Sequence, residues 1–238
     1  MPRKHLVASG INKKQQLQAK VWQKLAREIK AAVKVGGPNI DANPRLKAAV
    51  DKALQNNLSR ESIERNINGS NNAEDSKQVE FECYGPQGIQ IIVGGLTDNV
   101  NRITSNLRGY LSKLHGDIAK QNSVKIFFDN VGYIAVLKTD AINIDKIMES
   151  TMPYEVIDIV DQEDAIEVKV SPKDFYAAKQ ALSDGNAKIL DAEIKLMPQN
   201  IITELTQENV DKLERFIDSC NEDDDMQWVV TNYEGDYN

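Results

Sequence analysis

The chain has 238 residues, of which 41% are hydrophobic and 27% are charged. This balance is typical of a folded globular protein and argues against whole-chain disorder, which combines low hydrophobicity with high net charge. The sequence has no run of about 18 apolar residues that could span a bilayer, and its first residues lack the apolar stretch of a secretory signal. Its two cysteines, Cys83 and Cys220, are too few for a disulfide framework. We therefore expect a cytoplasmic protein without a membrane partner.

The net charge of -7 hides a strong asymmetry along the chain. Residues 1–68 contain 14 of the 29 basic side chains and five of the 36 acidic ones, so this segment has a net charge of +9. The rest of the chain contains the remaining 15 basic and 31 acidic side chains and has a net charge of -16. A segment that concentrates positive charge in this way can face the phosphates of a nucleic acid while the acidic remainder is repelled by them.

The first predicted element is a helix from Lys13 to Val35 with an apolar face and a basic face. Apolar residues recur at spacings of three and four, and at about 100° per residue the basic side chains gather on the opposite side. The glycines and proline at 36–38 end the helix, because glycine accepts the backbone angles of a C-cap and proline cannot continue the hydrogen-bond ladder. The apolar stripe contains Leu17, Val21, Leu25, Ile29, Ala32 and Val33.

Two shorter helices are predicted to follow in the first domain. Asn43 is the expected N-cap of one, with Pro44 in its first turn, and the other begins after Ser59 and ends near Gly69. Residues 69–78 are polar and lack periodicity, which indicates a linker. We therefore predict a helical first domain over residues 1–72. Its inward-facing residues after the first helix are Leu46, Val50, Ala53, Leu54, Ile63 and Ile67.

Beyond the linker the pattern changes from helical to alternating. The sequence predicts strands at 79–84 and 89–94, a helix at 99–114 that buries Val100, Ile103, Leu107, Leu111 and Leu114, and a strand at 123–129. A strand at 133–138, a helix at 144–150, strands at 155–161 and 165–170, a helix at 172–183 and a strand at 188–196 follow. This second series has the βαββαβ order of ferredoxin-like domains.

A last helix at 207–220 and a strand at 226–231 are expected to return to the first α/β unit. The predicted fold class is therefore α+β, in which a helical N-terminal domain is followed by two interleaved ferredoxin-like α/β domains. The first α/β domain is expected to be discontinuous, over 73–130 and 199–238, with the second inserted at 131–198.

The basic residues of the first domain are the main candidates for contact with nucleic acid. Phosphate binding and an ordinary solvated face are both open, but Lys and Arg outnumber the acids instead of alternating with them, which favours phosphate binding. Capping of the helix at 99–114 accounts for Asp98 or Asn99 but not for their neighbours Asn101 and Arg102, so those two are also open to a role in recognition. The candidate residues are Arg3, Lys4, Lys13, Lys20, Lys24, Arg27, Lys30, Lys34, Arg45, Lys52, Asn101 and Arg102.

Aromatic side chains are scarce in this basic domain. Trp22 flanks the apolar stripe of the first helix, and we expect it to lie in the core. Recognition of single strands by stacked bases is therefore less favoured than contact with the backbone of a duplex or a structured RNA.

Residues for catalysis or metal binding are also scarce. His5 and His115 have no visible partner for acid–base chemistry. The acids from Glu222 to Asp225 could hold a divalent cation, but consecutive acids lack the alternate spacing of a calcium loop, which favours a solvated loop. The glycine pairs do not form a nucleotide-binding loop. We therefore predict no catalytic residue, no metal and no cofactor.

Several strings of the sequence match a known family in order and spacing. They are Arg3-Lys4, Val35-Gly36-Gly37-Pro38, Asp41 to Leu46, Ala49 to Ala53, Tyr84 to Gly88, Leu96 to Arg102, Met197-Pro198 and Glu222 to Gln227. Over nearly its whole length the chain resembles the YebC-like family, which includes the mitochondrial translational activator of cytochrome c oxidase. Where the common family opening has a tryptophan, this chain has Lys4-His5-Leu6, which resembles a subgroup with a shorter motif.

This resemblance implies a three-domain protein with a role in gene expression. Some members are described as probable DNA-binding transcriptional regulators, whereas others act on translation, associate with ribosomes and relieve stalling at proline-rich stretches. Three hypotheses follow: a non-enzymatic DNA-binding transcriptional regulator, a ribosome-associated translation factor that binds ribosomal RNA, and a protein-interaction module. The residues themselves do not choose between DNA and ribosomal RNA as the partner.

Overall fold

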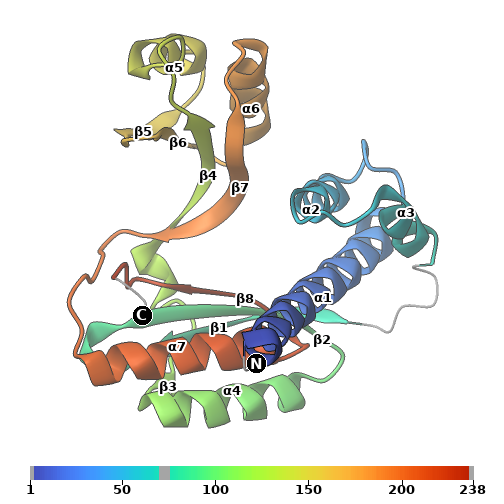
Figure 1. The fold of residues 1–238 in the computed structure, drawn as a ribbon, viewed down its shortest axis with the longest axis vertical. Coiled ribbons are helices and arrows are strands. Elements are labelled where there is room, and N and C mark those ends of the chain that lie inside the picture. The colour runs from blue at the N-terminus through green and yellow to red at the C-terminus, as the bar shows by residue number, and fades with distance from the viewer. Residues whose placement is uncertain (1–2, 70–75, 236–238) are drawn as a thin grey trace. The chain divides into compact units, whose positions relative to one another are not determined.

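The computed structural model describes residues 3–69 and 76–235, with the side chains of the first helix described from residue 18 onward (Figure 1). The chain divides into two compact units. One comprises Met1–Val124 with Ile202–Asn238, and the other comprises Lys125–Ile201. Helices and two antiparallel sheets make up the fold, and the predicted α+β class is confirmed. The predicted linker lies mostly outside the described residues.

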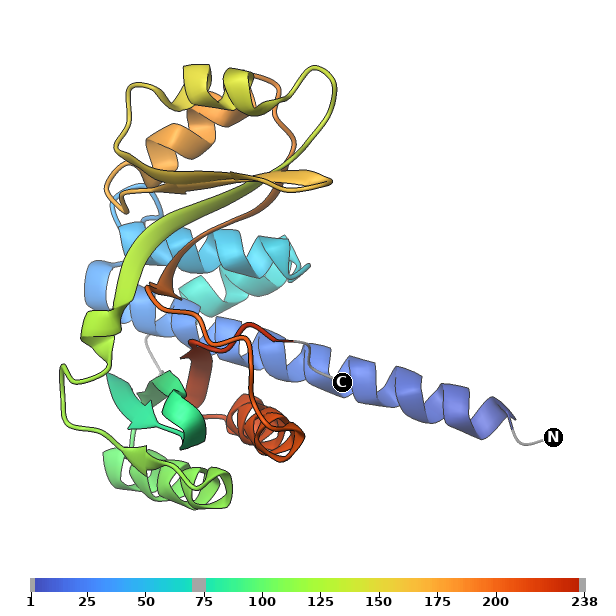
Figure 2. The ribbon, with the colours of Figure 1, turned by 90° about the vertical axis from the view of Figure 1, so that its left-hand side faces the viewer.

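The N-terminal part of the first unit is helical. It contains α1 (Arg3–Gly36), α2 (Pro44–Gln55) and α3 (Arg60–Asn68). Figure 2 shows α1 as one continuous rod, with α2 and α3 packed on one side of it. Within the described ranges, no helix combines the length and the apolarity needed to cross a bilayer. The buried cluster here is Leu25, Ile29, Ala32, Val33, Leu46, Ala49, Val50, Ala53, Leu58, Ile63 and Ile67.

The predicted caps of α2 and α3 are confirmed. The side chain of Asn43 accepts a hydrogen bond from the backbone N–H of Leu46 at 3.1 Å and donates to the carbonyl of Ala32 at 2.8 Å. Ser59 accepts from the N–H of Ser62 at 3.2 Å. Because Asn43 is buried and joins α1 to α2, it holds the corner between the two helices as well as capping one of them.

Two expectations for these helices were wrong. Helix α1 begins at Arg3 instead of Lys13. Val21, Trp22 and Leu54, which were expected to face the core, are 39%, 37% and 39% exposed. Trp22 instead donates its indole N–H to the carbonyl of Asn56 at 2.9 Å. The apolar stripe of α1 continues past the point at which the buried cluster ends, so periodicity alone overestimated burial.

The first α/β layer is a sheet in the order β3-β1-β2-β8, with all neighbours antiparallel. Its strands are β1 (Lys77–Tyr84), β2 (Gln90–Thr97), β3 (Asp117–Ile118) and β8 (Met226–Thr231). Helices α4 (Val100–Leu114) and α7 (Gln207–Glu222) lie side by side on one face of this sheet (Figure 1). The expected return of the last helix and strand to the first sheet is confirmed. The expected burial of Val100 is wrong, since it is exposed at the start of α4.

The strand predicted at 123–129 is wrong. The short strand β3 takes its place beside β1, and residues Lys125–Phe127 form a single 3-10 turn. The buried carboxylate of Glu82 accepts hydrogen bonds from the N–H groups of Asn122 and Val124 at 2.5 and 2.6 Å, which holds this segment against the sheet. Strand β4 (Phe128–Leu137) then runs on where the sequence suggested a break. Pairing with β7, joined by pairing with β6 from Gly132 onward, satisfies the backbone through Asn130 and Gly132.

The second unit is a ferredoxin-like layer. It contains β4, α5 (Ile144–Thr151), β5 (Val156–Asp161), β6 (Ala165–Val170), α6 (Phe175–Asp184) and β7 (Ile189–Pro198). The strand order is β5-β6-β4-β7, and every neighbouring pair is antiparallel. Both helices pack on the same face (Figure 2). This arrangement is the split βαβ topology that the βαββαβ order predicts.

Candidate nucleic-acid interface

Part of the basic face of α1 lies against the C-terminal end of α7. Lys20 donates to the carbonyl of Glu222 at 3.1 Å, and Lys24 donates to the carbonyl of Cys220 at 3.3 Å. The last carbonyls of a helix have no partner inside it and carry the negative end of the helix dipole, so ammonium groups are favoured there. These two predicted phosphate ligands therefore have partners within the chain.

The acidic loop between α7 and β8 forms ion pairs with two arginines. The carboxylate of Asp225, whose side chain is only 5% exposed, lies 3.2 Å from Arg27 and 2.7 Å from Arg102. Arg27 also donates to the backbone carbonyl of Asp224. Asp223 accepts hydrogen bonds from Asn106 at 2.8 Å and Tyr110 at 3.1 Å. The expectation of a solvated loop is therefore wrong for Asp223 and Asp225.

Neighbouring charges and burial shift the pKa values of several side chains around this loop. Hydrogen bonds to Asp225 and Asp98 raise the pKa of Arg102, and the same Arg102 lowers the pKa of Asp98. Burial lowers the pKa of Lys24, although Asp223 acts in the opposite direction. Burial beside Asp223 raises the pKa of Tyr110 to about 12. The ion pairs of Arg102 account for its presence after Asp98 without any external ligand.

The other predicted residues are spread over the helical part of the unit. Lys34 and Lys52 are exposed, Lys30 is half-buried on α1, and Asn101 is exposed in the first turn of α4. Arg45 pairs with Glu28 at 2.9 Å. Arg3, Lys4 and Lys13 lie in the part of α1 whose side chains are outside the description.

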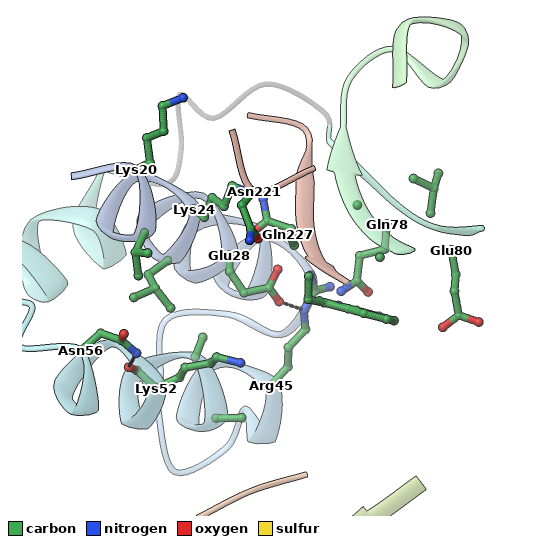
Figure 3. A pocket seen from close by; sticks show the side chains of 18 residues that line it. Lys20, Lys24, Glu28, Arg45, Lys52, Asn56, Gln78, Glu80, Asn221 and Gln227 are labelled. Atoms are coloured by element: carbon green, nitrogen blue, oxygen red, sulfur yellow. Dashed lines mark hydrogen bonds and ion pairs between the residues drawn. The ribbon is translucent and has the colours of Figure 1, made fainter. Parts of the chain in front are cut away.

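A groove separates α1 and α2 from the face of the first sheet that α4 and α7 leave uncovered (Figure 3). Its volume is about 680 Å³. Val79 and Phe81 pack into the core on the helix side of β1, so the alternate residues Gln78 and Glu80 face the opposite side. Figure 3 shows Arg45 of α2 and Gln78 of β1 pointing toward each other across this space. The groove is therefore lined by the basic helices on one side and by the sheet on the other.

Two polar groups that line this groove have no acceptor. Arg45 Nη2 and Gln227 Nε2 are the buried side-chain donors, within the ranges that the structure describes, that lack a hydrogen-bond partner. Leaving such a donor unpaired costs about 1–3 kcal/mol. An ordered water or a ligand supplies the acceptor that such a donor needs.

Trp228 on β8 also lines the groove, and sequence reasoning missed it. It lies opposite Gly94 of β2 in the sheet, and a Cβ atom added to Gly94 would lie 2.0 Å from the indole Cε2. The glycine therefore provides the space in which the ring lies. Paired glycines inside a strand are the signal that something approaches the backbone closely, but the partner of Gly94 cannot be known before the strand register. Gln78 and Gln227 were also missed, because their place in the groove depends on the pairing of strands that are far apart in the chain.

Over residues 3–69 and 76–235, no group of three or more His, Cys, Asp or Glu residues is placed to hold a metal ion. His115, one of the two histidines, is exposed and occupies the left-handed C-cap position of α4.

Comparison with known proteins gives matches over almost the whole chain. Residues 3–73 match the model of the TACO1/YebC protein N-terminal domain, and residues 76–233 match that of the TACO1/YebC second and third domain. A probable transcriptional regulatory protein of Ureaplasma urealyticum is 53% identical over 98% of this chain and 99% of its own length. One of Enterococcus faecalis is 36% identical over 90% of both chains. The crystal structure of a conserved hypothetical protein from Aquifex aeolicus superposes with a TM-score of 0.76 at 30% identity, covering 92% of this chain and 90% of that one.

Proposed function

Because the chain belongs to the TACO1/YebC family, we propose that it is a non-enzymatic, cytoplasmic regulator of transcription that binds DNA through its helical N-terminal domain. The relatives named as probable transcriptional regulatory proteins support a regulatory role. The observation that carries a nucleic acid as the ligand is the excess of positive charge in this domain, a net +9 over residues 1–68, and the names of the relatives favour DNA.

The exposed basic side chains are distributed over all of the helices of this domain. Lys34 near the end of α1, Lys47 and Lys52 on α2, and Arg60 and Arg65 on α3 are exposed. They belong to short, rigid helices with a shared buried cluster, so their spacing is held by the fold. Lysines and arginines arranged in this way contact phosphates and position a protein on a duplex without reading its sequence.

The basic side chains of α1 that contact α7 and the loop after it have a different role in this proposal. Lys20, Lys24 and Arg27 donate to the end of α7 and to the loop that follows it. We assign these three residues to holding the helical domain against the sheet, and we assign phosphate contact to Lys30, Lys34 and Lys52 together with the exposed residues of α2 and α3. The acidic remainder of the chain then orients the encounter by repelling the phosphates.

Salt-dependent binding of a random-sequence DNA duplex tests this function. Phosphate contact predicts that the logarithm of the association constant falls linearly with the logarithm of salt concentration, with a slope of about 0.9 per contacted phosphate. The measurement is fluorescence anisotropy between about 50 and 200 mM salt, with ribosomal RNA as competitor. Preferential binding to ribosomal RNA with a reproducible footprint would replace this function with the translation role. Absence of binding to either polymer at physiological salt would leave the protein-interaction role.

A further inference from the structure

The size of the groove between α1, α2 and the uncovered sheet face limits what it can hold. About 680 Å³ is within the range of roughly 300–1,000 Å³ that is typical of small-molecule sites. That volume suits one nucleotide and is far too small for a double helix. The charged side chains that line it, among the described residues, are Lys20, Lys24, Arg45 and Lys52 against Glu28 and Glu80, so the lining is net positive.

Trp228 gives this groove an aromatic wall. Its ring atoms Cε2, Cζ2 and Nε1 lie directly over Gly94, so one side of the indole is covered by the strand. The residue is nevertheless 37% exposed, and it lines the groove. An aromatic ring that is fixed on one side and open on the other is a stacking surface for a planar base.

The unpaired donors specify the chemistry of the ligand. Arg45 Nη2 and Gln227 Nε2 lack an acceptor and are closed to solvent, so a base edge reaches them when these two side chains turn toward the groove. Nucleobases supply such acceptors: thymine and uracil have the carbonyl oxygens O2 and O4, guanine has O6 and N7, and cytosine has O2 and N3. Lys52 adds positive charge to the same lining and would favour a phosphate beside such a base.

We propose that this groove binds one unpaired nucleotide of the bound nucleic acid, with its base stacked on Trp228 and its carbonyl edge facing Arg45 and Gln227. The inference rests on the proposed function, because the nucleotide belongs to the strand that the basic domain holds. It extends that function from contact with a phosphate backbone to capture of a base in a locally opened segment. It also replaces the expectation, based on Trp22, that base stacking is disfavoured.

Two probes of equal charge separate base capture from phosphate binding. One is a short thymidine oligonucleotide, and the other is an abasic oligonucleotide with the same number of phosphates. Stacking of one base predicts that the full-length protein binds the thymidine probe roughly tenfold more tightly than the abasic probe. The same titration predicts quenching of tryptophan fluorescence by the thymidine probe. Equal affinity for the two probes would overturn the proposal.

Two tryptophans of equal exposure provide a matched pair of variants. Trp228→Leu should remove the preference for the thymidine probe, whereas Trp22→Leu should retain it, because Trp22 is also 37% exposed but does not line the groove. Where Trp228→Leu does not fold, Gln227→Met is the second variant, since it removes a donor that has no partner and should leave stability unchanged. It should reduce the preference severalfold. Retention of the full preference in a folded Trp228→Leu or Gln227→Met protein would sink the idea.

The remaining outcomes distinguish this inference from the proposed function. Binding of duplex DNA without any thymidine preference overturns base capture and leaves the DNA-binding function in place. Loss of binding to every nucleic acid overturns both. Thymidine monophosphate that binds as tightly as the oligonucleotide would also overturn the proposal, because the groove would then be a site for a free nucleotide.

Discussion

Arg27 of α1 and Asp225 of the loop before β8 are 198 positions apart and form an ion pair at 3.2 Å. The carboxylate is almost fully buried, and Arg102 approaches it from α4 at 2.7 Å. The pair therefore joins the basic helical segment to the most acidic stretch of the chain. The opposite charges that the sequence segregates along its length meet again in the fold.

The first prediction concerns this buried carboxylate. Asp225→Asn should lower the free energy of unfolding by about 1–3 kcal/mol, because two arginines lose their charged acceptor. Urea unfolding followed by circular dichroism measures the change. Asp224→Asn is the matched control, since the Asp224 side chain is exposed and Arg27 contacts the backbone carbonyl of this residue. It should change stability by no more than about 0.5 kcal/mol. Equal effects of the two substitutions would contradict the assigned pairing.

The second prediction separates the two sets of basic residues. Replacing Lys34, Lys47, Lys52 and Arg60 by Gln should weaken DNA binding about equally for all sequences and make the salt dependence shallower, with little change in stability. Replacing Lys20, Lys24 and Arg27 by Gln should instead lower the unfolding midpoint, because these residues donate to the end of α7 and its loop. Anisotropy and urea unfolding of both variants check the assignment. A reversal of the two effects would refute it.

The third prediction compares two glycines. Gly94→Ala should destabilise the protein by about 1–3 kcal/mol, because its Cβ would overlap the ring of Trp228. The displaced ring should also shift its fluorescence, which is best seen in a Trp22→Phe background. Gly109 lies exposed in α4 with nothing within 4 Å of the added Cβ, so Gly109→Ala should stabilise by about 0.5–1 kcal/mol. Destabilisation by both substitutions would count against the packing described for Trp228.

The fourth prediction concerns the two thiols. Cys83 and Cys220 are 0% and 1% exposed, and burial raises the pKa of each to about 12. Because thiol reagents attack the thiolate, both should be unreactive in the native protein near neutral pH and should react fully in denaturant. The ordinary pKa of a thiol is 9.0, so above that pH the unfolded chain loses its thiol protons while the folded chain still keeps them. The free energy of unfolding should therefore fall as the pH rises above 9.0. Rapid labelling of the folded protein would show that one of them is accessible.

The fifth prediction concerns Asp98 at the start of α4. The hydrogen bond from Arg102 lowers the pKa of its carboxyl below the ordinary 3.8. The stability that this pair contributes is therefore fully present above that value and is lost as pH falls through the lowered folded-state pKa. Titration of the carboxyl by nuclear magnetic resonance should give a value below 3.8. In Arg102→Gln it should return toward the ordinary value, and an unchanged titration in that variant would rule out Arg102 as the cause.

Features that depend on a few neighbouring residues were predicted well. Asn43 and Ser59 cap their helices, and β6 and β8 have the predicted bounds, because caps and alternation are local properties of the chain. The strand at 123–129 was wrong because the carboxylate of Glu82, 42 positions before Val124, accepts a hydrogen bond from the N–H of Val124 and holds the start of that segment out of a strand. Val21 and Leu54 have helical spacing, but whether they are buried depends on how far the neighbouring helices extend.

By itself, the sequence determined the order of helices and strands, the α+β class and the separation of positive from negative charge. It did so because periodicity, capping and charge counts need no knowledge of distant contacts. Only the tertiary structure decided which charges are engaged and where a ligand could enter. The register of β2 with β8 places Trp228 over Gly94, and the packing of α1 against the end of α7 brings Lys20 and Lys24 to its carbonyls. Such pairings join residues far apart in the chain, so their energies depend on the whole fold and leave no pattern in any short stretch of sequence.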